Sequence, residues 1–328
     1  MKRKLQAQTK TLSHRKRRKQ GSTFSHHRYI YDAAQLVLFL TSPIESSDNK
    51  EEASTPQYVQ PFDDKKDTYR LVTAYGDQWG NRTFVRVAQN VKTGDIWVCF
   101  RPTILGDLNP TSLISEKGVL VRLRNLLDIA HAVNIAEVGP DGLSSGIKGL
   151  LEEPMENTDG QPLLRCLERD VKKWNAELRG GAKILFTGYS LGSAQALCAA
   201  AAIATPVHCV QLAGPRVVRR EGVEKIAGRL ASCTYVGLVG DPVSQMPFSG
   251  EDFEIVGEQI WVDTSRWRLT AKPAESMCPR RMLNFLVGVY MGLTLNLRRG
   301  IGECARAFLD VHLEAEVDLY RILKGVLG

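Results

Sequence analysis

The chain has 328 residues, 43% of them hydrophobic and 24% charged, with a formal net charge of +7. This length and apolar content suffice for one α/β domain with a large core, or for two small domains. No run of eighteen apolar residues occurs, which argues against a conventional membrane span. The seven cysteines lack metal-ligand spacing and are predicted to be reduced core thiols of an intracellular protein: Cys99, Cys166, Cys198, Cys209, Cys233, Cys278 and Cys304.

The positive charge is concentrated at the N-terminus, where residues 1–28 are predicted to be a basic disordered arm ahead of a domain over 29–328. Residues 1–20 hold nine lysines and arginines and no acid, so taking these nine from the net +7 leaves −2 for the rest. The excess therefore does not indicate a nucleic-acid-binding domain. Lys2–Lys4 and Arg15–Lys19 have the arrangement of a two-part nuclear import signal, which an import receptor would bind. The alternatives are an arm for nucleic acid or acidic lipid headgroups with peripheral membrane contact, an organelle transit peptide, or a solubilising tail.

The first half of the chain predicts a helix, a pair of strands and two further helices. No secretory signal peptide begins it, so we expect a protein that is not secreted. A short helix over Tyr29–Leu40 precedes a polar loop over 41–66. Alternating apolar and polar residues predict two strands joined by the turn Asn90–Gly94. Two segments with helical spacing follow, and Gly180-Gly181 is predicted to end the second helix. These segments are Thr83–Gln89 and Asp95–Arg101 for the strands, and Val119–Val133 and Leu163–Leu178 for the helices.

The second half predicts alternating strands and helices. A strand over 183–187 leads into an alanine-rich helix over 191–204, whose small side chains would let it lie close to a sheet. Val207–Ala213 and Cys233–Val239 are near-continuous apolar runs, typical of parallel strands buried on both faces. Glu254–Asp263 has the pattern of a hairpin, and Met282–Leu297 and Glu303–Leu327 are expected to be helices. The predicted fold class is α/β, with a mostly parallel central sheet flanked by helices.

The most informative stretch is Gly188-Tyr189-Ser190-Leu191-Gly192, between the apolar run 184–186 and the alanine-rich helix. A serine nucleophile needs this strand–turn–helix context, and the turn is so tight that the residues two before and two after must be almost free of side chains. Gly188 and Gly192 meet that requirement, which predicts Ser190 as a nucleophile. The alternative is an ordinary turn.

A serine nucleophile needs a base, usually a histidine oriented by a carboxylate. On the α/β-hydrolase topology the chain order is Ser, acid, His, and only His208 and His312 follow Ser190. His208 lies within the next strand and is interpreted as a strand histidine, so His312 is the predicted base. Asp241 follows a buried strand and is the predicted acid; the competitors are Asp252, Asp263 and Asp310, and the alternative for each is a solvated surface residue.

The oxyanion of an acyl-transfer reaction needs two converging donors. One is expected to be the N–H of Leu191, the residue after the nucleophile. The other is expected from Thr103, in the segment Phe100-Arg101-Pro102-Thr103 that ends an earlier strand.

Five motifs in order resemble those of the class 3 lipases, a family of α/β-hydrolases that includes the filamentous-fungal triacylglycerol lipases. The similarity covers roughly residues 65–325. The motifs are Ile184–Ser193 for the serine pattern, Phe100–Thr103 for the oxyanion segment, Gly214-Pro215-Arg216-Val217, Gly240-Asp241-Pro242-Val243 for the acid, and Asp310-Val311-His312 for the base. The departures are Pro102 and Ser193 where glycine is expected, Gly240 where asparagine is expected, and no tryptophan-aspartate pattern in the lid region Leu105–Gly118.

The residues and the resemblance together predict a serine-dependent lipase that cleaves acyl esters of lipids at an interface, acylglycerols above all. Neither a metal nor an organic cofactor is expected. A lipid- or polyanion-binding protein that kept the fold without the activity is the alternative, and a nuclear interaction protein is a third. The sequence does not indicate an oligomeric state.

Overall fold

The computed structural model describes residues 29–34, 36–37, 58–59, 68–76, 84–102, 138–155, 158–239, 241, 243–245, 252–263 and 268–270. The polar loop predicted over 41–66 is wrong at Tyr58–Val59, which form a short strand, and the rest of that loop lies outside these residues. The predicted basic arm and the lid region lie outside them as well. So do the predicted helices over 119–133, 282–297 and 303–327.

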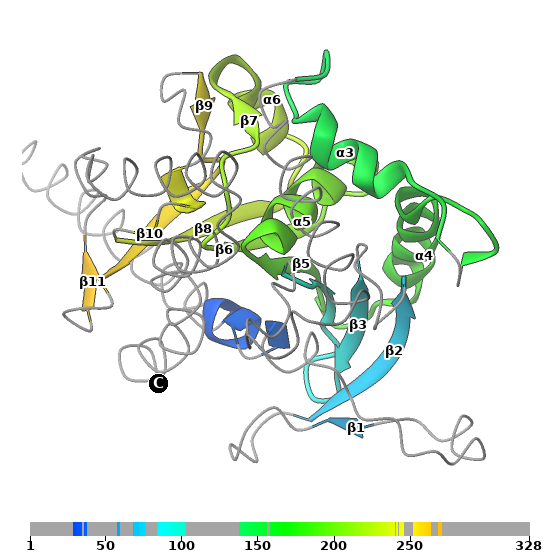
Figure 1. Cartoon of the computed structure of the whole chain (residues 1–328). Coiled ribbons are helices and arrows are strands. Elements are labelled where there is room, and N and C mark those ends of the chain that lie inside the picture. Colours follow the sequence, from blue (N-terminus) through cyan, green and yellow to red (C-terminus); the bar gives the residue numbers. More distant parts are fainter. Residues whose placement is uncertain are drawn as a thin grey trace, which may run out of the picture.

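A nine-stranded sheet forms the centre of the described structure (Figure 1). Its order is β1-β2-β3-β4-β5-β6-β8-β10-β11, and β7 pairs with β9 in a separate small sheet. The strands are β1 Tyr58–Val59, β2 Tyr69–Tyr75, β3 Val85–Asn90, β4 Ile96–Phe100, β5 Ile184–Tyr189, β6 His208–Leu212, β7 Val218–Arg219, β8 Ser232–Leu238, β9 Phe253–Glu254, β10 Glu258–Asp263 and β11 Arg268–Thr270.

The middle of the sheet is parallel, from β4 through β5, β6 and β8 to β10. Strands β1 to β4 pair antiparallel on one side and β11 pairs antiparallel on the other. Every residue of β4 and β5 is buried, because side chains on both faces of these strands are covered. The α/β class with a mostly parallel central sheet is therefore confirmed.

Helices cover both faces of this sheet. The described helices are α3 Ser145–Glu152, α4 Leu163–Glu177, α5 Leu191–Ala202 and α6 Val223–Ala227, with short 3-10 helices η5 at Arg220–Gly222 and η6 at Val243–Gln245. Ten of the twelve residues of α5 are buried, which its alanines allow, and it packs on β5, β6 and α3. On the opposite face, helical residues within 29–37 pack against Trp97 and Leu185. The predicted N-terminal helix is confirmed for these residues, and no helix in the described part is long and apolar enough to cross a membrane.

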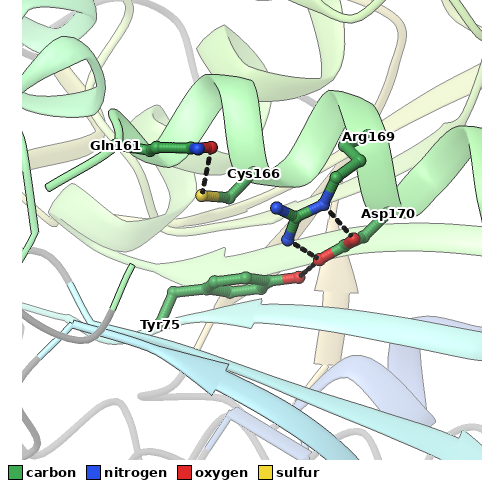
Figure 2. A network of polar contacts seen from close by, with 5 residues as sticks. All are labelled: Tyr75, Gln161, Cys166, Arg169 and Asp170. Atoms are coloured by element: carbon green, nitrogen blue, oxygen red, sulfur yellow. Dashed lines mark hydrogen bonds and ion pairs between the residues drawn. The ribbon is translucent and has the colours of Figure 1, made fainter. Parts of the chain in front are cut away.

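Helix α4 is fastened to β2 by a polar network (Figure 2). The Tyr75 hydroxyl donates a hydrogen bond to Asp170 Oδ2 over 2.5 Å, and Arg169 Nε donates to Asp170 Oδ1 over 2.8 Å. Helix α4 ends where the backbone of Leu178 becomes extended, and Gly180 and Gly181, with φ of 68° and 80°, form the turn that follows instead of the helix cap. This network lies on the antiparallel side of the sheet.

The predicted hairpin over Glu254–Asp263 is wrong. Strand β9 pairs with β7, whereas β10 pairs parallel with β8, so the two halves of the segment belong to different sheets. Gly257, with φ of 89°, separates them and lies against the backbone of Cys233, where a Cβ would strike the Cys233 carbonyl. Two strand-like runs separated by a short turn do not say which partner each strand will find, because the whole sheet decides the pairing.

Candidate active site

Ser190 stands between β5 and α5 in a strained conformation. Its φ is 56° and its ψ is −127°, a region that residues with side chains rarely adopt and that costs about 1–3 kcal/mol. The Ser190 N–H donates to the carbonyl of Leu212 at the end of β6 over 3.0 Å, and the Ser190 carbonyl accepts from Ser193 N over 3.0 Å. The residue is half-buried. The surrounding structure thus holds the serine at the carboxyl edge of the parallel strands.

The two glycines of the turn are required by contact. A Cβ on Gly188 would strike the Gly192 carbonyl and lie 2.7 Å from Ser193 N. On Gly192, a Cβ would lie 2.5 Å from the Phe100 carbonyl oxygen and 2.7 Å from that of Arg101. Real Cβ atoms essentially never approach other atoms so closely. Only glycine therefore fits at either position.

The close approach at Gly192 also brings the predicted oxyanion segment beside the turn. Arg101 follows β4, its N–H donates to the carbonyl of Phe84 over 3.0 Å, and its guanidinium stacks over the Phe84 ring at 5.1 Å. Leu191 begins α5, and the first N–H groups of a helix have no carbonyl acceptor within it. Two of the expected components of an oxyanion hole, Leu191 and the segment before Thr103, are thus adjacent. Thr103 itself lies outside the described residues.

Asp241 is fully buried just after β8. Its carboxylate accepts hydrogen bonds from the N–H of Val243 at 2.9 Å, from the N–H of Ser244 at 3.3 Å and from Ser244 Oγ at 2.7 Å. These donors belong to the short helix η6, so the acid is held by the N-terminal turn that follows it. The arrangement fixes the carboxylate in one orientation, as the orienting acid of a triad requires.

The loop after β6 joins the serine turn to the strand that leads to Asp241. A Cβ on Gly214 would strike Ser193 Oγ and lie 3.2 Å from the Ser190 carbonyl oxygen. The Gly214 carbonyl in turn accepts a hydrogen bond from Tyr235 Oη of β8 over 2.8 Å. Burial raises the pKa of Tyr235, and the charge of Asp241 adds to this. The phenol therefore stays protonated and keeps this donor throughout the ordinary pH range.

The strand order brings Ser190 and Asp241 to one edge. Ser190 follows β5 and Asp241 follows β8, with only β6 between these strands. Asp263 ends β10, which is parallel to β8, so this competitor lies at the same edge but one strand further from Ser190. Asp252 lies beside the small second sheet, where its carbonyl accepts from Arg220 N.

Of the two histidines that follow Ser190, the structure describes His208 but not His312. His208 begins β6, where its Nδ1 lies 2.7 Å from Ser232 Oγ, at the amino end of the strands and opposite the serine turn. This position agrees with its interpretation as a strand histidine. His312 and Asp310 lie outside the described residues. Among the described residues, no group of three His, Cys, Asp or Glu side chains could hold a metal ion.

Three further residues support the site, and this role was not predicted for them from the sequence: Gly214, Tyr235 and Ser244. The role of Ser244 had a local signal in the sequence. An aspartate often accepts hydrogen bonds from the backbone N–H groups two and three residues later, and this forms a common type of turn. Gly214 belongs to the motif Gly214–Val217, but nothing in the sequence indicated its hydrogen bond with Tyr235, because that bond joins the loop after β6 to β8.

A parallel sheet with a strained serine between a strand and a helix defines the class of α/β-hydrolases. Residues 160–251 match the sequence model of the family described as lipase (class 3). The matched segment contains the serine turn and Asp241. The resemblance to this family is therefore confirmed over this segment.

Similar solved structures are fungal lipases. They include a triacylglycerol lipase from Penicillium expansum (13% identity, 77% of this chain and 84% of that chain, TM-score 0.47). The Lip2 lipase from Yarrowia lipolytica has 14% identity over 73% of this chain and 79% of that chain, with a TM-score of 0.45. The triacylglyceride lipase of Rhizomucor miehei has 16% identity over 60% and 68%, with a TM-score of 0.38. All three TM-scores are below 0.5, so the fold assignment depends on this chain's own strand order and serine turn. No curated protein matches the sequence.

Proposed function

We propose that this protein is a serine-dependent carboxylic ester hydrolase that cleaves acyl esters of lipids, with Ser190 as its nucleophile. The observation that carries the proposal is the strained backbone of Ser190, held where only Gly188 and Gly192 fit on either side. Strain of this kind persists only where the surrounding structure imposes it, and it clusters at active sites.

The proposed mechanism uses the predicted triad and oxyanion donors. His312 takes the proton of Ser190 Oγ as the oxygen attacks the acyl carbonyl, and Asp241 holds the imidazole tautomer. The N–H groups of Leu191 and Thr103 stabilise the tetrahedral oxyanion. The alcohol leaves with the proton from His312, and an acyl ester remains on Ser190. Water, deprotonated by His312, then releases the fatty acid.

The substrate class is proposed from the family match. Residues 160–251 match the class 3 lipase family, and one of the similar solved structures is named a triacylglycerol lipase. We therefore propose an acylglycerol at a lipid–water interface as the substrate. Asp241 supports a catalytic use of the site, because its two oxygens are already oriented by three donors.

A second candidate, a lipid-binding protein without activity, is favoured by one residue. Pro102 directly follows Arg101 in the oxyanion segment and has no N–H, where the family has glycine. If the oxyanion hole depended on that N–H, the protein would bind lipid esters without turning them over.

Replacing Ser190 with alanine tests the proposal. The purified Ser190→Ala variant is expected to lose at least about 1,000-fold in hydrolysis of p-nitrophenyl butyrate, because no other group supplies the nucleophile. Ser232→Ala is the matched control, since this half-buried serine pairs with His208 at the opposite end of the strands. Equal activity in Ser190→Ala and wild type would overturn the assignment, and an inactive wild type that still binds lipid vesicles would favour the second candidate.

A further inference from the structure

Two cysteines face each other across the strands that lead to the candidate site. Strands β6 and β8 lie side by side (Figure 1), and Cys209 of β6 is the direct partner of Cys233 of β8 in this parallel pair. Neighbouring strands lie about 4.8 Å apart, and paired residues point to the same face. Disulfides span Cα separations of about 4.4–6.8 Å, so this backbone places the two thiols within bonding range.

The two thiols have different surroundings. Cys209 is 1% exposed, and a hydrogen bond with Cys233 together with burial raises the pKa of its thiol. Cys233 is half-buried, and Gln211 Nε2 donates a hydrogen bond to its sulfur over 3.2 Å. The more exposed sulfur is the one that peroxide reaches first. Cys233 is therefore the thiol that reacts first, and Cys209 is the thiol that completes the bond.

We propose that Cys209 and Cys233 form a peroxide-sensitive dithiol whose reversible disulfide slows the reaction at Ser190. The thiolate of Cys233 attacks one oxygen of hydrogen peroxide and breaks the O–O bond. This gives a sulfenic acid, and the second oxygen leaves as water with the thiol proton. The sulfur of Cys209 then attacks the sulfur of Cys233, the S–O bond breaks, and the Cys209 proton leaves in a second water. Two thiols are oxidised by two electrons, and one peroxide is reduced to two waters.

The strand geometry makes this bond reversible. The Cβ atoms of a disulfide lie about 3.8 Å apart, closer than the spacing of neighbouring strands, so β6 and β8 must be drawn together locally. Strained disulfides are reduced more easily than relaxed ones and are typical of regulatory bonds.

The same two strands hold the candidate site, which couples the bond to the serine. The carbonyl of Leu212, three residues after Cys209, accepts the hydrogen bond from Ser190 N. Strand β8 leads to Asp241, and its Tyr235 donates to Gly214 beneath the serine turn. A displacement of β6 toward β8 therefore moves the supports of the strained serine. This part of the proposal rests on the proposed function.

The cross-link is tested first on the unmodified protein. The folded protein is treated with hydrogen peroxide, alkylated, digested with trypsin without reduction and analysed by mass spectrometry. We expect a dithiothreitol-sensitive link between peptides 184–216 and 230–266, which contain the two cysteines. Absence of this link when the remaining thiols are still alkylated would overturn the proposal.

Variants then assign the bond. Peptide 184–216 also contains Cys198, a buried thiol near Cys209. The link is expected to persist in Cys198→Ala and to disappear in Cys209→Ala, with thermal melts checking that both variants fold. A link that disappears in Cys198→Ala and persists in Cys209→Ala would contradict the assignment.

The effect on the site is read from the rate at which a fluorophosphonate probe labels Ser190. Peroxide is expected to slow labelling at least threefold in wild type and in the control Cys166→Ala, whose buried thiol lies on α4. Dithiothreitol should restore the rate, and Cys233→Ala should not respond to peroxide. An unchanged rate in protein shown to be cross-linked would refute the coupling, whereas no labelling of the reduced protein would refute the proposed function and leave the cross-link result standing.

Discussion

Two residues at the carboxyl edge of the sheet have strained backbone conformations, and the proposed chemistry depends on one of them, Ser190. Ser190 and Ala213 have φ of 56° and 46°, and they end the neighbouring strands β5 and β6. Each is fixed from the next strand, Ser190 N by the Leu212 carbonyl at 3.0 Å and Ala213 N by the Val236 carbonyl at 2.8 Å. The serine conformation is thus imposed by hydrogen bonds that run successively across β5, β6 and β8.

The identity of the acid can be tested at this scale, because two aspartates end neighbouring strands at the same edge. Asp241→Asn is expected to reduce turnover of p-nitrophenyl butyrate by about 10³–10⁴-fold, since an amide favours the wrong histidine tautomer. Asp263→Asn is the control, from the strand one place further from Ser190. It should leave turnover close to that of wild type. The reverse pattern, measured on variants with matched melting temperatures, would move the acid to Asp263.

The local part of the site could be predicted in detail from the sequence, whereas its cross-strand part could be predicted only as the meeting of the Phe100–Thr103 segment and Asp241 with the serine turn, without the contacts. Gly188, Ser190 and Gly192 were recognised because the serine turn, its strand and its helix are continuous in the chain. The contact of Gly192 with Phe100 and Arg101, and that of Gly214 with Ser193, join residues that the strand order alone brings together. No spacing in the sequence encodes such contacts.

At the scale of elements, apolar runs predicted the buried parallel strands well. The runs at 207–213 and 233–239 became β6 and β8, and 163–178 became α4, each within two residues of the predicted ends. Buried strands need apolar side chains on both faces, so their signal is independent of their neighbours. The hairpin prediction for 254–263 was wrong because the whole sheet decides which strands pair. In addition, nothing in the local sequence indicates the close approach of Gly257 to Cys233.

The attachment of α4 to β2 gives a test of stability. Tyr75→Phe is expected to lower the free energy of unfolding by about 1 kcal/mol at neutral pH, because Asp170 loses one hydrogen bond. Burial alone would raise the pKa of Asp170, but the hydrogen bonds from Arg169 and Tyr75 lower it below its usual range. The stabilisation is therefore present above about pH 4, the unfolded value, and is lost as the pH falls through the folded pKa. Urea unfolding at pH 7 and pH 3 measures both effects, and a difference between variant and wild type that grows on acidification would contradict this role.

For the whole molecule, charge and sequence motifs indicate separate roles for the N-terminal segment 1–20 and the segment 160–251. The family match covers residues 160–251, which include the serine turn, whereas the nine basic residues without an acid are confined to 1–20. Because a concentrated positive charge acts on partners and not on the fold, we propose that this segment directs the protein to its location.

A reporter fusion tests that separation. Residues 1–20 fused to a fluorescent protein are expected to accumulate in nuclei, and replacing Arg15–Lys19 with alanine should return the fusion to an even distribution. The charge-matched control has the same residues in scrambled order. Accumulation of the fusion at cell membranes would assign the segment to acidic lipids instead, and an even distribution of the unaltered fusion would refute the import role.

The most direct measurement is covalent labelling of the folded protein with a fluorophosphonate, followed by fragmentation of the tryptic peptide 184–216. This peptide contains two serines, Ser190 at the strained turn and the fully buried Ser193 three residues later. We predict one phosphonate per chain, attached to Ser190, present in Ser193→Ala and absent from Ser190→Ala and from unfolded protein. Attachment at another residue, or no attachment to folded wild-type protein, would contradict the assignment of Ser190 as an activated nucleophile.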